Sequence, residues 1–231
     1  MDTLNIFCDA SIQKDVFSLY KETVGCPGYI CMTYDDNGYP VILDEGFRIL
    51  RHSTNNEAEI TAILMGVEKA VQMRHQFKTI NLFSDSRICI QSLRNWIFNW
   101  VNNRDKDGIM YGSGGNYVAN QQIISKVVTT ISINNLNINL WHQKGHVNTR
   151  LQSHIDNAKK LFMSENNVSG VSDEFIMKIS YFNNKIDQDT KIHLSNMIPT
   201  LQPERKVDMK YPMRYTLDNN IILNYRNMIN V

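Results

Sequence analysis

Strand-like and helix-like patterns of apolar residues alternate over the first 164 residues of the chain. Short apolar runs bounded by turn residues predict strands, and apolar residues three or four apart predict helices with one buried face. The strands are expected at 4–8, 29–34, 41–50, 79–84 and 136–141, and the helices at 54–71, 88–100, 118–131 and 149–162. This order predicts an α/β fold, a mixed five-stranded sheet of three antiparallel and two parallel strands with helices on both faces.

Local signals define several of these boundaries. Asp35-Asp36-Asn37-Gly38 is typical of a hairpin between the second and third strands. Thr54-Asn55-Asn56-Glu57 fits a capping box, in which the Thr and Glu side chains each bond a free backbone N–H at a helix start. Gly25-Cys26-Pro27-Gly28 predicts a turn before the second strand, after a long polar loop that begins at Ser11.

The pattern loses clarity after residue 164, where prolines and asparagines are scattered among cancelling charges. We therefore expect one domain over residues 1–164 and a C-terminal extension, of short helical or irregular structure, over 165–231. No chemistry is assigned to the extension from its sequence. A protein partner or self-association through it is left open.

Composition narrows the class of protein without identifying it. The chain has 24 Lys and Arg against 23 Asp and Glu, so a formal net charge of +1 excludes a polycation or an acidic tail. A hydrophobic fraction of 42% suffices for a sizeable core. No apolar run approaches the roughly 18 residues of a membrane span, so we expect a cytoplasmic protein. Its four cysteines lack CxxC spacing, which favours free buried thiols over zinc ligands.

Four carboxylates are expected to converge at one sheet edge. Asp9 and Asp85 end two strands, Glu59 shares the inner face of the first helix, and Asp156 lies beside apolar positions of the last predicted helix. Taken singly, each has an ordinary explanation as a cap, an ion-pair partner or a solvated residue. Clustered carboxylates repel one another unless cations neutralise them, and oxygen ligands favour Mg²⁺ or Mn²⁺. Two such ions can hydrolyse a phosphodiester, which points to nucleic acid as substrate.

Six ordered motifs resemble the type 1 ribonuclease H family over residues 3 to about 164. They are Ile6-Phe7-Cys8-Asp9-Ala10-Ser11, Thr54-Asn55-Asn56-Glu57-Ala58-Glu59, Ser84-Asp85-Ser86, Asn95-Trp96-Ile97-Phe98-Asn99-Trp100, Lys144-Gly145-His146 and, ten residues after His146, Asp156. The resemblance implies a ribonuclease H-like fold. It also implies a metal-dependent endoribonuclease that cleaves the RNA strand of RNA–DNA hybrids, leaving 3′-hydroxyl and 5′-phosphate ends.

The same resemblance implies roles for individual residues. Asp9, Glu59, Asp85 and Asp156 would bind two Mg²⁺ ions, with Mn²⁺ as a substitute, and His146 would assist the attacking water or product release. Substrate contacts are implied for Ser11, Thr54, Asn55, Asn56, Trp96, Trp100 and Asn116. Two roles are expected for the Thr54 hydroxyl, as helix cap and as hydrogen-bond donor to a phosphate, and it cannot easily fill both at full strength. Two tryptophans at helical spacing are more often part of the core, and for Trp96 a place in the core is an equal alternative.

Departures from the family pattern and rival functions remain open at this point. Ala10 replaces a glycine, His52 stands where an arginine often completes a phosphate pocket, and the Asn102–Gly115 segment lacks a basic handle, so modest hybrid affinity is expected. One rival is a catalytically weak or silent binding module that acts through its extension. Another is a related integrase, resolvase or exonuclease, although the exonuclease Asp-x-Glu motif is absent because Ser11 stands two after Asp9.

Overall fold

The computed structural model describes residues 2–17, 22–204 and 217–230. Parts of two predicted segments, at 18–21 in the long loop and 205–216 in the extension, lie outside the described residues. In chain order the strands are β1 (Thr3–Gln13), β2 (Val24–Tyr34), β3 (Pro40–Phe47), β4 (Leu50–Arg51), β5 (Thr79–Ser84), β6 (Ile138–His142) and β7 (Ile229–Asn230). The α-helices are α1 (Asn55–Met73), α2 (Arg87–Gln91), α3 (Ile97–Asn102), α4 (Gln121–Ile133), α5 (Gln152–Asn166), α6 (Asp173–Met197) and α7 (Asn219–Met228).

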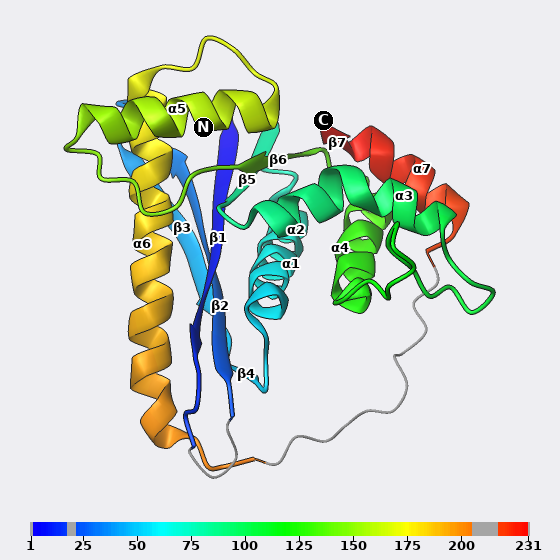
Figure 1. Ribbon diagram of the computed structural model, residues 1–231. Coiled ribbons are helices and arrows are strands. Elements are labelled where there is room, and N and C mark those ends of the chain that lie inside the picture. Colours follow the sequence, from blue (N-terminus) through cyan, green and yellow to red (C-terminus); the bar gives the residue numbers. More distant parts are fainter. Residues whose placement is uncertain (1, 18–21, 205–216, 231) are drawn as a thin grey trace.

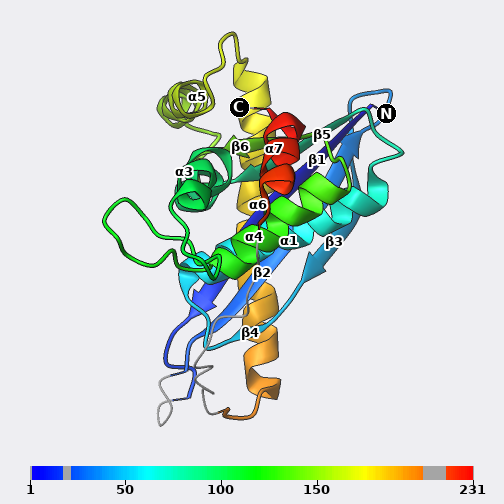
Figure 2. The ribbon, with the colours of Figure 1, turned by 90° about the vertical axis from the view of Figure 1, so that its right-hand side faces the viewer.

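One mixed sheet organises the molecule, in the order β3-β2-β1-β5-β6-β7, with β4 beside β2. The β1, β2 and β3 strands are antiparallel, whereas β1, β5 and β6 are parallel. The predicted five-stranded sheet of the ribonuclease H-like fold is therefore confirmed, and two short strands extend it. Helices lie on both faces, with α6 on one side of the sheet and α1 and α4 on the other (Figures 1 and 2).

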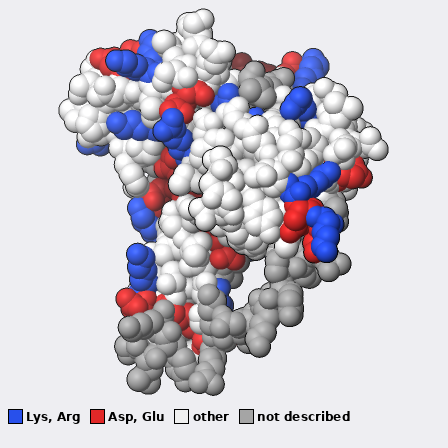
Figure 3. Space-filling model, turned by 45° about the vertical axis from the view of Figure 1, so that its right-hand side comes forward, with Lys and Arg blue, Asp and Glu red and all other residues white. Residues whose placement is uncertain are grey.

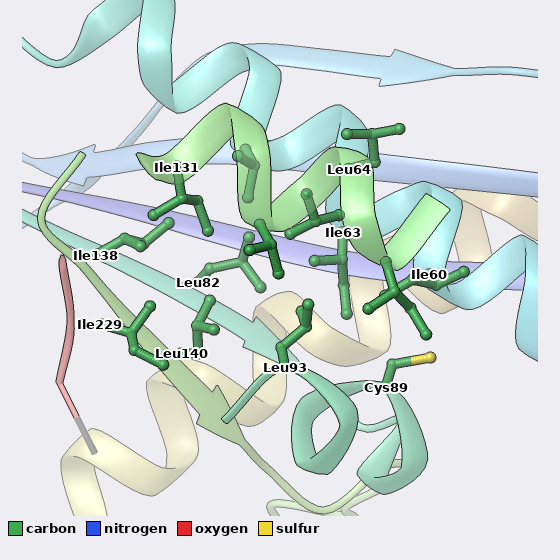
Figure 4. Packing of buried hydrophobic residues seen from close by; sticks show 14 of the residues in the cluster. Ile60, Ile63, Leu64, Leu82, Cys89, Leu93, Ile131, Ile138, Leu140 and Ile229 are labelled. Carbon is green, nitrogen blue, oxygen red and sulfur yellow. The ribbon is translucent and has the colours of Figure 1, made fainter. Parts of the chain in front are cut away.

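The core on the α1 side joins the parallel strands to helices α1, α2, α3, α4 and α7. Ile60, Ile63 and Leu64 of α1 meet Leu82 of β5 and Leu140 of β6, and the C-terminal Ile229 packs beside them (Figure 4). At Gly66 of α1, an added Cβ would lie 2.6 Å from the Cys8 sulfur of β1. The absence of a side chain at Gly66 therefore lets α1 lie directly on β1. All four cysteines are buried and free, as expected.

The core on the opposite face depends on α6. Apolar residues recur along this 25-residue helix at 176, 179, 182 and 186, and they pack against Phe7, Ile30, Met32 and Phe83 of the sheet. Phe182 stacks on Phe7 with ring centroids 5.2 Å apart. Residues 173–197 are thus one long helix and not a short or irregular segment. The expected boundary at residue 164 does not separate two cores, because α6 shares its core with the sheet.

The Gly25–Gly28 segment lies inside β2 and does not form the predicted turn. An added Cβ at Gly28 would lie 2.7 Å from the Phe47 ring and 2.9 Å from Thr190 Cγ2 of α6. Gly28 thus allows α6 and β3 to approach β2. The glycine is needed for this tertiary contact, but in the sequence alone it looks the same as a glycine in a turn. Because β1 and β2 both run further than expected, the loop between them is shorter than predicted.

Candidate functional site

Two strands place Asp9 and Asp85 at the same sheet edge. Phe7 of β1 pairs in parallel with Phe83 of β5, so Asp9 and Asp85 each stand two residues beyond a paired position. Asp9 is buried, and its Oδ1 accepts the backbone N–H of Ala10 at 2.7 Å. The two carboxylates are neighbours as expected, but β1 continues to Gln13, so Asp9 lies within its strand and only Asp85 follows a strand end.

The N-terminal part of α1 adds Glu59 to this pair. Thr54 caps the helix: its hydroxyl accepts the Glu57 N–H at 3.2 Å, and Glu57 accepts the Thr54 N–H at 3.4 Å, which confirms the capping box. The helix begins at Asn55, so Glu59 in its second turn points toward the sheet and is 7% exposed. Ligand oxygens of Asp9, Glu59 and Asp85 all lie within 4.8 Å of one another.

The electrostatics of the three carboxylates follow from this crowding. Burial, with a smaller contribution from Asp85 and Asp187, raises the pKa of Asp9 to about 8. Burial and the charge of Asp9 raise the pKa of Glu59 well above its usual value. Burial also raises the pKa of Asp85, although a hydrogen bond from Asn183 and the nearby His146 oppose the shift. The cluster therefore needs a cation or protons to balance its charge.

A hard divalent cation fits these residues. Within the described parts of the chain, Glu59 Oε2 is buried and has no hydrogen-bond partner. A buried acceptor without a partner is costly, and a metal ion would satisfy it. The donors are carboxylate oxygens, which are the ligands that Mg²⁺ prefers. Asp9, Glu59 and Asp85 thus form a candidate metal site.

The fourth carboxylate at the site is Asp187 of α6. It lines the same cleft as the other three, of about 710 Å³, and its charge raises the pKa values of Asp9, Glu59 and Asp85. Asp187 was not among the carboxylates expected at the site, because no chemistry could be assigned to residues 165–231 from their sequence. A detectable signal was nevertheless present, because the apolar spacing from 176 to 186 and the Ser172 cap predict an amphipathic helix.

Asp156 does not join the cluster, which corrects its expected position. It is exposed on α5, where its Oδ1 accepts a hydrogen bond of 2.9 Å from Gln152 Nε2. The physical reason is the placement of the two last long helices: α6 packs on β1 and β2 beside Asp9, whereas α5 packs on β6 and α6. Sequence position after His146 suggested α5, but the packing brings α6 to the acids.

The loop after β6 closes the cleft at Asp85. A Cβ added to Gly145 would lie 2.2 Å from Asp85 Oδ2, so a larger residue here would displace the carboxylate or the loop. The next residue, His146, has a left-handed backbone (φ 53°), is 71% exposed and has its Nδ1 3.5 Å from Asp187 Oδ2. From the other side, Asn183 of α6 donates to Asp85 Oδ2 at 3.3 Å. The structure thus brings the predicted His146 to the acidic cluster.

Six of the seven predicted substrate contacts line two adjoining cavities, and Thr54 lines neither of them. Asn55, Asn56 and Ser11 line the cleft of the acids. Ser11 is buried, and its hydroxyl lies 2.8 Å from the Thr190 hydroxyl, so it also fixes α6 to β1. Thr54 is exposed at the head of α1, and because its oxygen is an acceptor in the capping box, its own hydroxyl hydrogen remains a donor. The two roles expected for Thr54 are therefore compatible.

The second cavity, of about 270 Å³, holds the two tryptophans. Trp96 and Trp100 lie with ring centroids 5.9 Å apart and face this cavity together with Asn116 and Asn56. Trp96 is 40% exposed and therefore does not belong to the core.

A π-helical turn, Ser92–Trp96, interrupts the helix predicted at 88–100. The hydroxyl of the buried Tyr225 of α7 donates a hydrogen bond of 3.0 Å to the Leu93 carbonyl of this turn.

The mixed sheet, with Asp9 and Asp85 side by side near the carboxyl end of β5, defines a protein with a candidate acidic metal site. The family model for RNase H matches residues 1–160, and the chain belongs to the RNase H family. The ribonuclease H of Tropheryma whipplei (strain Twist) is 28% identical over 104 residues, which are 45% of this chain and 53% of that protein. The chain thus matches about half the length of this curated relative.

Solved structures of the family share the fold. The solution structure of the PFV RNase H domain has a TM-score of 0.50 and 18% identity, over 72% of this chain and 96% of that one. The foamy viral protease–reverse transcriptase in complex with an RNA/DNA hybrid has a TM-score of 0.50 and 13% identity, over 71% of this chain and 20% of that one. Identities this low carry the fold alone.

Proposed function

We propose that the protein is a metal-dependent endoribonuclease that cleaves the RNA strand of RNA–DNA hybrids and leaves 3′-hydroxyl and 5′-phosphate ends. One observation supports this most directly: Asp9, Glu59 and Asp85 converge at a cleft in which Glu59 Oε2 has no partner among the described residues. Family membership and the hybrid bound by the foamy viral relative agree with it.

In this proposal, Asp9, Glu59, Asp85 and Asp187 hold two Mg²⁺ ions, for which Mn²⁺ can substitute. Such ions supply a hydroxide nucleophile and stabilise the leaving oxygen of an in-line displacement. His146 stands at the mouth of the cleft, next to Asp187, where an imidazole can accept a proton from the attacking water or donate one to a leaving group. Gly145 and Asn183 fix the Asp85 carboxylate from two sides.

The walls of the two cavities suit the two strands of a hybrid. Asn55, Asn56 and Ser11, beside the acids, are assigned to the RNA strand, whose 2′-hydroxyls donate and accept hydrogen bonds. Trp96, Trp100 and Asn116 are assigned to the DNA strand, and Thr54 to one of its phosphates at a helix N-terminus. Their apolar cavity adjoins the cleft, because Asn56 and Ile88 line both.

Charge on the surface suggests modest affinity. On the face shown in Figure 3, Lys and Arg side chains are isolated or stand beside acidic ones, with broad uncharged areas between them. The formal net charge is +1. Because counterion release from phosphates supplies most non-specific affinity, binding of the hybrid should depend on contacts in the cleft more than on a basic surface.

A cytoplasmic location stays a prediction. Among the described residues, no helix has the length and apolar character to span a membrane.

The proposal is tested by cleavage of labelled RNA–DNA hybrid, double-stranded RNA and double-stranded DNA, in Mg²⁺ or with chelator. We expect only the hybrid to be cut, only with Mg²⁺, and Asp85→Asn to be inactive. Asp187→Asn and Asp156→Asn form a matched pair: the first should lose at least about 100-fold in rate, as expected for a residue of the charged machinery, and the second should remain near wild type. Intact hybrid in Mg²⁺ contradicts the enzyme, and equal cutting of all three substrates contradicts the specificity.

A further inference from the structure

The α6 helix presents a polar stripe to the acidic cleft. Asn183, Asp187, Lys191 and Ser195 follow one another at intervals of four, so they lie on one helix face. Asn183 bonds Asp85, and the other three line the cleft. Since Phe182 and Ile186 bury the adjoining face of α6 in the core, the stripe is held firmly against the carboxylates.

Lys191 brings a positive charge into this cleft. Its Nζ lies 2.7 Å from a carboxylate oxygen of Asp187, and its side chain is 56% exposed. The charge reaches beyond this pair, since it lowers the pKa of Asp9 against the larger effects of burial and Asp85. Arg87 also lines the cleft, but it pairs with Glu165 on α5. Lys191 therefore pairs with the acidic cluster itself.

We propose that Lys191 is a tethered cation that neutralises Asp187 in the metal-free protein and must leave this carboxylate when divalent cations bind. The inference rests on the proposed function, because it concerns metal loading of the same site. A lysine suits the role because its ammonium is a compact charge on a flexible four-carbon stem. Its exposure leaves room for it to swing toward solvent or toward a substrate phosphate.

The charges in the cleft indicate how Lys191 would link metal binding to hybrid binding. Once metal binding has displaced their protons, the carboxylates of Asp9, Glu59, Asp85 and Asp187 carry four negative charges, which two divalent ions would balance. Lys191 then leaves one positive charge in excess, and one phosphodiester of a substrate restores neutrality. Full loading with metal is therefore opposed by Lys191 in the free protein and relieved when a nucleic-acid phosphate enters the cleft. Metal and hybrid should bind cooperatively, and Lys191 should carry much of that coupling.

The test is calorimetric titration of Mg²⁺ into the full-length protein without nucleic acid. Lys191→Met should lower the Mg²⁺ dissociation constant about tenfold, which is the effect of a unit charge about 6 Å from a divalent ion in a water-like dielectric. Lys191→Arg retains the charge and should bind Mg²⁺ as the wild type does. Lys185→Met is the matched control, because it removes another i,i+4 pair of α6, with Asp189. Its Mg²⁺ affinity should equal that of the wild type.

A second titration measures the coupling. A hybrid with a 2′-O-methylated, cleavage-resistant RNA strand should tighten Mg²⁺ binding in the wild type more than in Lys191→Met. Equal Mg²⁺ affinities of Lys191→Met and wild type, within twofold, or weaker binding by the variant, would overturn the role of Lys191. Absence of Mg²⁺ binding in the wild type would overturn the metal site, and this inference with it. Metal binding and hybrid cleavage that are indifferent to Lys191 would overturn this inference alone.

Discussion

Replacing Gly145 with alanine tests the close approach of the His146 loop to Asp85. The new methyl group would lie 2.2 Å from Asp85 Oδ2 and 3.1 Å from its Cγ. An ordinary contact begins at about 3.4 Å, so the loop or the carboxylate must move by about 1.2 Å. Such overpacking costs about 1–3 kcal/mol in stability. Its effect on the barrier to reaction is of similar size, since a displacement of about 1 Å at a reacting centre can cost about 100-fold in rate, or about 2.7 kcal/mol.

The assay is steady-state hybrid cleavage together with Mg²⁺ titration and thermal unfolding. For Gly145→Ala we expect kcat to fall about 100-fold and Mg²⁺ to bind more weakly, while the folded state persists. Gly114→Ala is the matched control, because its added Cβ would meet its nearest neighbour, Asn116 Nδ2, at an ordinary 3.5 Å. If Gly145→Ala kept both its Mg²⁺ affinity and its rate within threefold of the control, the loop would not press on Asp85 as described.

Three further predictions concern packing, α7 and pH. Removal of residues 165–231 should give a protein that is insoluble, or unfolded as judged by circular dichroism, because loss of Ile176, Phe182 and Ile186 uncovers one apolar face of the sheet. A soluble fragment that folds cooperatively would contradict this. Tyr225→Phe should lower the free energy of unfolding by about 1–3 kcal/mol in denaturant titrations, since the Leu93 carbonyl loses its buried donor, and an unchanged midpoint would refute that. Folding raises the pKa of Asp9 from 3.8 to about 8, so the folded state binds a proton that the unfolded state has lost. The metal-free protein should therefore lose thermal stability as the pH rises from about 4 through about 8. A melting temperature that rises over this range would contradict the buried cluster.

Much of the site is predictable because its signals are local. An aspartate directly after β5, or a capping box five residues before Glu59, fixes a side chain relative to its own element. The parallel pairing of β1 and β5 then brings Asp9 and Asp85 together. The sheet order follows from the same alternation of strands and helices, which is why five strands could be anticipated.

The rest depends on contacts between distant segments. Asp187 lies 178 positions after Asp9, and nothing near it in sequence indicates that α6, and not α5, packs on β1. Gly28 is required because Phe47 and Thr190 approach it, which only the assembled fold reveals. The π-helical turn beside Trp96 likewise has its Leu93 carbonyl bonded to Tyr225, 132 residues away. The local pattern of apolar and polar residues predicts none of these contacts.

The most direct test of the acidic site is the location of bound metal. Crystals grown or soaked with Mn²⁺ would give anomalous scattering that identifies each ion without reference to activity. We expect two peaks bounded by Asp9, Glu59, Asp85 and Asp187, one of them against Glu59 Oε2. Peaks elsewhere, or an ion held by Asp156 while Asp187 stays paired with Lys191, would contradict the account.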